Sequence, residues 1–132
     1  MRTNVLVLMM MVVACQSKEK KQEKLDQHVI DSVSVYCPGT NPDGYILYYF
    51  DATCSFCIAK ASSLQSSADS SHAKLLLIAA SDNPILAGNY LKKSGIRSCV
   101  IHTGYASYDK YLKFNSCLQL DKDFQVTAHL DD

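Results

Sequence analysis

The sequence predicts an α/β domain with a central mixed β-sheet and flanking helices. Two apolar runs, at residues 45–50 and 74–80, have the length and continuity of strands that are covered on both faces. A segment with helical features follows each of them. Near the C-terminus, residues 116–120 and 124–130 alternate between apolar and polar side chains around a short charged turn, which predicts a β-hairpin in the same sheet.

Further elements are expected between these segments. Alternation of side chains over residues 29–36 predicts a strand ahead of the central one. A polar residue followed by proline at 83–84, with lysines at 92 and 93 and a glycine at 95, predicts a helix over 84–93. Residues 98–101 predict a short strand, and the spacing of apolar side chains over 105–112 predicts a short helix.

Two cysteines stand where the central strand gives way to a helix, which we expect over residues 54–67. The apolar side chains of this helix recur at helical spacing: Cys57, Ala61, Leu64 and Ala68. Cys54 lies outside that stripe, so we expect it to be reachable and Cys57 to be more buried. A helix N-terminus favours the thiolate and lowers the pKa of a cysteine from ~8.5 to ~7 or below. An attacking thiol at Cys54 and a resolving thiol at Cys57 would suit thiol–disulfide exchange.

Composition excludes several classes of function. The chain has 132 residues, with 13 basic and 13 acidic side chains, and no basic stripe, so we expect no nucleic-acid partner. No glycine-rich phosphate loop, serine triad or convincing carboxylate pair is visible. We therefore expect neither a cofactor nor a resident metal.

The N-terminus has the features of a targeting segment. Arg2 supplies a positive charge, and residues 5–13 form an apolar run that is too short to span a bilayer. The run ends in Val-Val-Ala followed by Cys15, which resembles the bacterial lipobox. That resemblance implies cleavage before Cys15 and a lipid on its sulfur, which would attach the protein to a membrane.

This interpretation divides the chain into three parts. Residues 1–14 would be the signal peptide, 15–27 the lipidated cysteine with a polar tether, and 28–132 the folded domain. The tether is interpreted as a solvated linker, with a sorting signal as the alternative. Loss of Arg2 with the signal would leave a net charge of −1 with histidine neutral. We expect the protein in the bacterial cell envelope.

Six cysteines occur, and lipidation of Cys15 would leave an odd number. Disulfides persist outside the cytoplasm, so one pair, Cys54 with Cys57, can cycle. Cys99 and Cys117 are candidates for a second pair, which would leave Cys37 over. The sequence leaves this connectivity open.

The order of elements, and above all residues 45–64 with their Cys54-Ser55-Phe56-Cys57 motif, resembles the thioredoxin-like thiol–disulfide oxidoreductases of bacterial envelopes. The resemblance implies that Cys54 is the nucleophile and Cys57 the resolving cysteine. It implies protein or small-molecule thiols and disulfides as substrates, and a separate redox protein as electron donor. It favours disulfide reduction, although the Ser-Phe dipeptide matches neither the familiar reducing nor the familiar oxidising dipeptide.

Three features depart from that family. Thr53 replaces the aromatic residue that usually precedes the first cysteine. Asn115 or Ser116 stands where the family has a cis-proline, so we expect a trans peptide and a different substrate groove lined by these residues. The family's closing helix is absent from the sequence before Asp132. One face of the sheet would then be covered by residues 29–36, by a partner, or not at all.

Two alternatives remain open. Cys54 and Cys57 would supply two soft ligands to a metallochaperone site, with Cys99, Cys117 or His102 nearby, although these further ligands are scattered along the sequence. The missing proline and helix also fit a non-catalytic lipoprotein that uses a thioredoxin-like domain for binding.

Asp51, three residues before Cys54, has two interpretations. It would tune the cysteine pair or carry a proton, or it would shape the turn at the end of the strand. We favour the turn.

Overall fold

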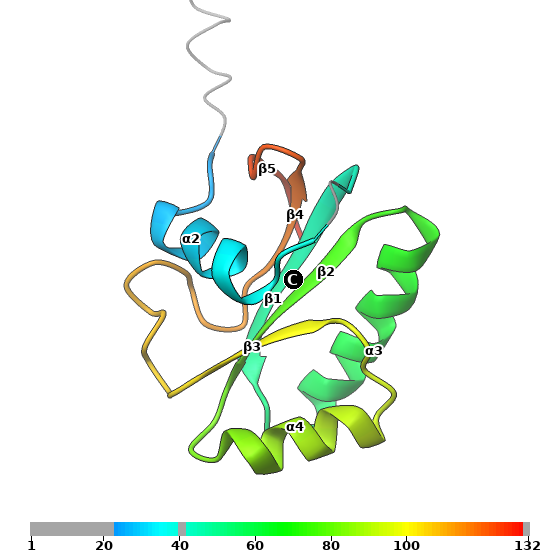
Figure 1. Ribbon diagram of the computed structural model, residues 1–132, viewed down its shortest axis with the longest axis vertical. Helices are drawn as coiled ribbons and strands as arrows, with labels where there is room; N and C mark the ends of the chain where they lie inside the picture. Colours follow the sequence, from blue (N-terminus) through cyan, green and yellow to red (C-terminus); the bar gives the residue numbers. More distant parts are fainter. Residues whose placement is uncertain (1–22, 40–41, 131–132) are drawn as a thin grey trace, which may run out of the picture.

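The computed structural model describes residues 23–39 and 42–130. Within these ranges, five strands form one sheet in the order β3-β2-β1-β4-β5, with helices on both faces (Figure 1). In chain order the elements are α2 (Gln27–Tyr36), β1 (Gly44–Asp51), α3 (Ser55–Ser70), β2 (Lys74–Ala80), α4 (Pro84–Lys93), β3 (Cys99–Thr103), β4 (Cys117–Asp121) and β5 (Val126–His129).

The sheet is mixed, as the sequence predicts. Strand β1 lies at its centre, parallel to β2 and antiparallel to β4. Strand β3 continues the parallel half, and β4 and β5 form the expected hairpin, with an irregularity between Gln119 and Leu120. The continuous apolar sequence of β1 is explained by its position, because five successive residues, 46–50, are buried between the two helical layers.

Two apolar clusters lie on opposite faces of the sheet. Helices α3 and α4 cover one face, where Phe50 and Leu77 are buried. Helix α2 and the irregular segment 104–116 cover the other, where Tyr49 and Leu76 are buried. Figure 1 shows the same separation, with α3 and α4 on one side of the strands and α2 on the other. Of the three expected ways to cover this second face, packing by the segment around residues 29–36 is correct.

The strand expected over residues 29–36 is wrong, because this segment is the helix α2. The Asp26 side chain caps its N-terminus by accepting a hydrogen bond from the His28 backbone N–H at 2.9 Å. Val29 and Val33 lie one turn apart, and both are buried against the sheet. Val35, which a strand would have placed on the same side as these two valines, is 70% exposed.

The helix expected over residues 105–112 is also wrong, because the structure shows a series of turns there. Two of the apolar side chains that predicted it, Tyr108 and Leu112, are buried in the cluster beneath α2. The Tyr108 hydroxyl donates to Ser32 Oγ of α2 at 2.8 Å. Side-chain contacts with the rest of the domain therefore position this segment, and a regular helical hydrogen-bond pattern does not.

The N-terminal boundary of packing lies before residue 28. Leu25, which we expected in the polar tether, is buried in the cluster beneath α2. Its backbone N–H donates to the carbonyl of Phe124 at 3.0 Å, beside the hairpin. The lipidation candidate Cys15 and most of the tether lie outside the described residues. No helix in the described ranges has the length and apolar character needed to cross a membrane.

The candidate pairing of Cys99 with Cys117 is wrong. Cys99 forms a disulfide with Cys37, which joins the C-terminal cap of α2 to β3. Cys117 is fully buried in the cluster beneath α3 and α4, whereas Cys99 packs against the cluster on the opposite face of the sheet. The sheet itself therefore separates these two sulfurs.

Candidate functional site

Cys54 lies in a turn between the carboxyl end of β1 and the start of α3. Its backbone N–H donates to the carbonyl of Asp51 at 3.1 Å, and the preceding Ala52 N–H donates to the carbonyl of Ala80 at 2.9 Å. Cys54 itself is the N-cap of α3, with an extended backbone. The sequence places the cysteine pair correctly at a strand-to-helix junction, and the cap position puts the Cys54 sulfur at the positive end of the helix dipole.

The two sulfurs of the motif are joined in a disulfide between Cys54 and Cys57. The Cys54 Sγ also accepts a hydrogen bond from the backbone N–H of Cys57 at 3.1 Å. Such a donor stabilises negative charge on sulfur once the disulfide is opened. Cys57 packs against the cluster beneath α3, while both cysteines are half-buried, so the expected contrast in exposure between them is weak. Phe56, between them, is 83% exposed.

Asp51 holds the shape of the turn that precedes Cys54. Its Oδ1 accepts hydrogen bonds from the Thr53 backbone N–H at 2.9 Å, the Thr53 hydroxyl at 2.7 Å and the Tyr105 hydroxyl at 2.9 Å. Burial of the carboxyl opposes its ionisation, but the hydrogen bonds from Thr53 and Tyr105 outweigh burial and lower the pKa of Asp51 below its usual value. The geometry thus assigns Asp51 the turn-forming role that we favoured.

The residues expected at the substrate groove, Asn115 and Ser116, lie beside the carboxyl half of β1. The Ser116 carbonyl accepts the N–H of Tyr49 at 3.0 Å, and Ser116 is buried. Asn115 has a φ of 66°, in the left-handed region that asparagine tolerates better than most residues. The peptide bonds of the described residues are all trans.

A groove of about 660 Å³ lies between α3 and α4, next to the cysteine pair. Thr53 and Ser55, the neighbours of Cys54, line one part of it. Ile58 from α3 and Leu86 and Tyr90 from α4 give it an apolar lining. This groove was not predicted from the sequence, because its shape depends on how two helices pack. The spacing of Leu86 and Tyr90, one turn apart on α4, was the available signal.

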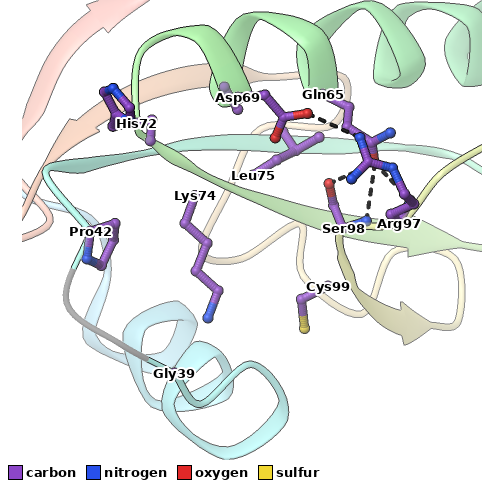
Figure 2. A pocket seen from close by; sticks show the side chains of 12 residues that line it. Gly39, Pro42, Gln65, Asp69, His72, Lys74, Leu75, Arg97, Ser98 and Cys99 are labelled. Atoms are coloured by element: carbon purple, nitrogen blue, oxygen red, sulfur yellow. Dashed lines mark hydrogen bonds and ion pairs between the residues drawn. The ribbon is translucent and has the colours of Figure 1, made fainter.

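A second, polar pocket of about 530 Å³ lies beside the Cys37–Cys99 disulfide (Figure 2). Gln65, buried on α3, accepts hydrogen bonds from the backbone N–H groups of Arg97 at 2.6 Å and Ser98 at 3.1 Å. These bonds fix the segment that leads into Cys99. At the other end of the pocket, Lys74 Nζ donates to the carbonyl of Cys37 at 2.9 Å, so both halves of the disulfide are held by neighbouring side chains.

The further metal ligands that the sequence suggested do not gather around the cysteine pair. Cys99 is bonded to Cys37, and His102 is an exposed residue of β3. Within residues 23–39 and 42–130, no group of three or more histidine, cysteine or acidic side chains is arranged to hold a metal ion.

Several solved structures that are similar to this one come from bacterial thiol–disulfide proteins. A secreted disulfide oxidoreductase of Mycobacterium tuberculosis shares 15% identity, with a TM-score of 0.56 over 68% of this chain and 69% of that chain. The thioredoxin domain of a thiol–disulfide oxidoreductase from Bacteroides vulgatus shares 8% identity, with a TM-score of 0.58 over 83% and 82%. A thiol:disulfide interchange protein from Chlorobium tepidum shares 10%, with a TM-score of 0.58 over 83% and 84%.

No protein-family model and no curated protein sequence matches the chain. At these levels of identity the structural similarity establishes the fold and leaves the chemistry to be argued from the site. The chain has a thioredoxin-like fold. This assignment is supported by the mixed sheet, the flanking helices and the position of the cysteine motif.

Proposed function

We propose that this protein carries out thiol–disulfide exchange through Cys54 and Cys57. The observation that carries the proposal is the geometry of the pair at the start of α3. The two sulfurs bond one another across one turn, and Cys54 Sγ also accepts a backbone N–H as the helix cap. A sulfur in this position is a better thiolate than an ordinary cysteine and has its resolving partner within bonding reach.

The reduced pair would act in two steps. The Cys54 thiolate attacks one sulfur of a substrate disulfide, and the second substrate sulfur leaves as a thiolate. Cys57, as a thiolate, then attacks Cys54 Sγ, which breaks the mixed disulfide and releases the first substrate sulfur. The substrate gains two electrons and takes up two protons, and the Cys54–Cys57 disulfide is formed. A donor dithiol protein restores the reduced pair by the same exchange.

We also propose the direction of the exchange and the cellular location of the protein. Disulfide reduction in the bacterial cell envelope is favoured by the lipobox-like sequence that ends at Cys15 and by the resemblance to envelope proteins. A lipid on Cys15 would attach the domain to a membrane through the tether.

A redox titration of the full chain in detergent tests the exchange chemistry. We expect the Cys54–Cys57 pair to titrate as a reversible two-electron couple. Alkylation of the free thiols measures the reduced fraction at each potential. The Cys57→Ser variant should accumulate a mixed disulfide with a model substrate, and the matched Cys54→Ser variant should not. If Cys54 is inert to substrate and to alkylation after reduction, the proposal is wrong, and a non-catalytic binding protein becomes the better interpretation.

The anchor is tested separately. Metabolic labelling with an alkyne-bearing fatty acid should mark the wild type and leave Cys15→Ser unlabelled and released from membranes. Equal labelling of the two proteins would contradict lipidation at Cys15.

A further inference from the structure

We propose that the groove between α3 and α4 binds an apolar, acidic segment of a polypeptide substrate whose disulfide is attacked by Cys54. The inference rests on the proposed exchange activity and adds to it a substrate class. It differs from the expectation based on Asn115 and Ser116, which are not among the residues that line this groove.

Position is the first argument. Two of the residues that line the groove, Thr53 and Ser55, flank Cys54 directly in the chain. From there the groove follows α3 past Ile58 and reaches the C-terminal half of α4. A chain that is bonded to Cys54 through one of its cysteines can therefore lay its neighbouring residues along the groove without leaving the surface.

The chemistry of the lining is the second argument. Leu86 and Tyr90 remain more than two-fifths exposed although they lie on a helix whose opposite side is buried. Phe56, the chain neighbour of Ser55, is exposed as well, and exposed apolar surfaces of this kind mark interaction sites in soluble domains. A small hydrophilic disulfide would leave this surface uncovered, whereas an apolar side chain of a polypeptide would bury it.

Charge selects among polypeptides. Among the residues that the structure describes, Lys93 is the one charged side chain lining the groove, and none of the lining residues is acidic. Lys93 belongs to the last turn of α4, and Lys92 beside it does not line the groove. A carboxylate on the substrate segment would complement Lys93, while a lysine or arginine there would be repelled.

In the proposed complex, the Cys54 thiolate bonds one sulfur of the substrate cystine and the other substrate sulfur leaves as a thiolate. The residues next to the bonded cysteine occupy the groove until Cys57 displaces them with their sulfur. Reduction of the enzyme pair by added dithiothreitol supplies the electrons for each cycle.

The test compares three disulfides with the full-length protein: a peptide cystine flanked by leucine and glutamate, the same peptide with serine and lysine, and bis(2-hydroxyethyl) disulfide. We expect the wild type to reduce the first peptide with the highest kcat/KM. Leu86→Ser and Lys93→Glu should each lower kcat/KM for that peptide about tenfold more than for the small disulfide, mainly through KM. The matched controls Ile85→Ser and Lys92→Glu should leave all three values within about twofold.

Equal losses for all three substrates, or equal losses in the controls, would overturn the inference. The proposed activity fails in a different way, because the wild type would then reduce none of the three disulfides. In that event, binding in the groove is tested separately, by the fluorescence anisotropy of the labelled leucine–glutamate peptide in the presence of the protein. Weaker binding to Leu86→Ser than to Ile85→Ser supports the groove, and equal binding contradicts it.

Discussion

Asp51 shows how much of the site depends on one polar side chain. Its carboxylate ties the turn before Cys54 to Tyr105, which belongs to the irregular segment 104–116 on a different part of the chain. The sequence allowed the position of the cysteine pair to be predicted, because an apolar strand and a cysteine motif are local patterns. The partner Tyr105 is 54 residues away from Asp51 and left no local signal.

The Asp51→Asn substitution should destabilise the protein by about 1–2 kcal/mol at pH 7, because a charged acceptor of three hydrogen bonds becomes neutral. The pKa of Asp51 is lowered in the folded state, so its stabilising contribution is present above the unfolded pKa of about 4 and is lost as the pH falls through the folded value. Urea unfolding of both proteins between pH 7 and pH 2.5 should show the difference shrinking in acid. Asp43→Asn, at an exposed residue, is the control and should show no such trend.

Tyr49 should give the opposite pH dependence. Burial, together with the hydrogen bond to Asp109 and the charge of Asp109, raises the pKa of Tyr49 to about 12. The folded protein therefore keeps this proton between pH 10 and 12 while the unfolded chain releases it, and stability falls as the pH rises through that window. Compared with Tyr49→Phe, the wild type should lose up to about 3 kcal/mol more over this range in urea unfolding. Parallel losses in the two proteins would contradict the assignment.

At the scale of elements, the sequence predicted the segments with strong local signals. The bounds of β2 and α4 were predicted correctly, since a continuous apolar run and a proline-started helix each allow one interpretation. Helix α2 was not predicted, because its alternating valines fit the period of a strand. Two of these valines also fit the period of a helix. Packing against the sheet decides between the two. The groove beside Cys54 belongs to neither helix alone and for that reason could not be predicted.

Two valines of α2 test the helical assignment. Val29→Ala should cost about 2 kcal/mol, because Val29 is fully buried and the substitution leaves a cavity against the sheet. Val35→Ala should change stability by less than about 0.5 kcal/mol, because Val35 is 70% exposed. Chemical unfolding of the two variants measures both effects. Similar losses would indicate that the two side chains share one buried face, as they would in a strand.

At the scale of the whole molecule, the sheet separates two chemically different halves. The α3 and α4 face carries the candidate reactive pair and the groove, while α2 and segment 104–116 seal the other face. The Cys37–Cys99 disulfide fastens this second layer to an edge strand, across 62 residues of sequence. The disulfide thereby helps to hold α2, which precedes the sheet in the chain, against the sheet face that it covers.

Removal of this disulfide should be costly. Closing a loop of this length restricts the unfolded chain enough to contribute about 4 kcal/mol to folding. The Cys37→Ser/Cys99→Ser double variant should lose about that amount in urea unfolding under oxidising conditions. The Cys54→Ser/Cys57→Ser variant should lose clearly less, because its disulfide closes a loop of only three residues. Comparable losses would show that the long loop is already restricted in the unfolded chain.

The disulfide between α2 and β3 has a consequence for its own reduction potential. By thermodynamic linkage, the free energy that a disulfide adds to folding stability also makes that disulfide harder to reduce in the folded protein. For a two-electron couple, about 4 kcal/mol corresponds to a midpoint lower by roughly 90 mV. Under the proposed exchange, a donor whose potential lies between the midpoints of the two disulfides would reduce Cys54 and Cys57 and leave Cys37 and Cys99 oxidised. The same polypeptide would then hold one cycling disulfide and one permanent disulfide.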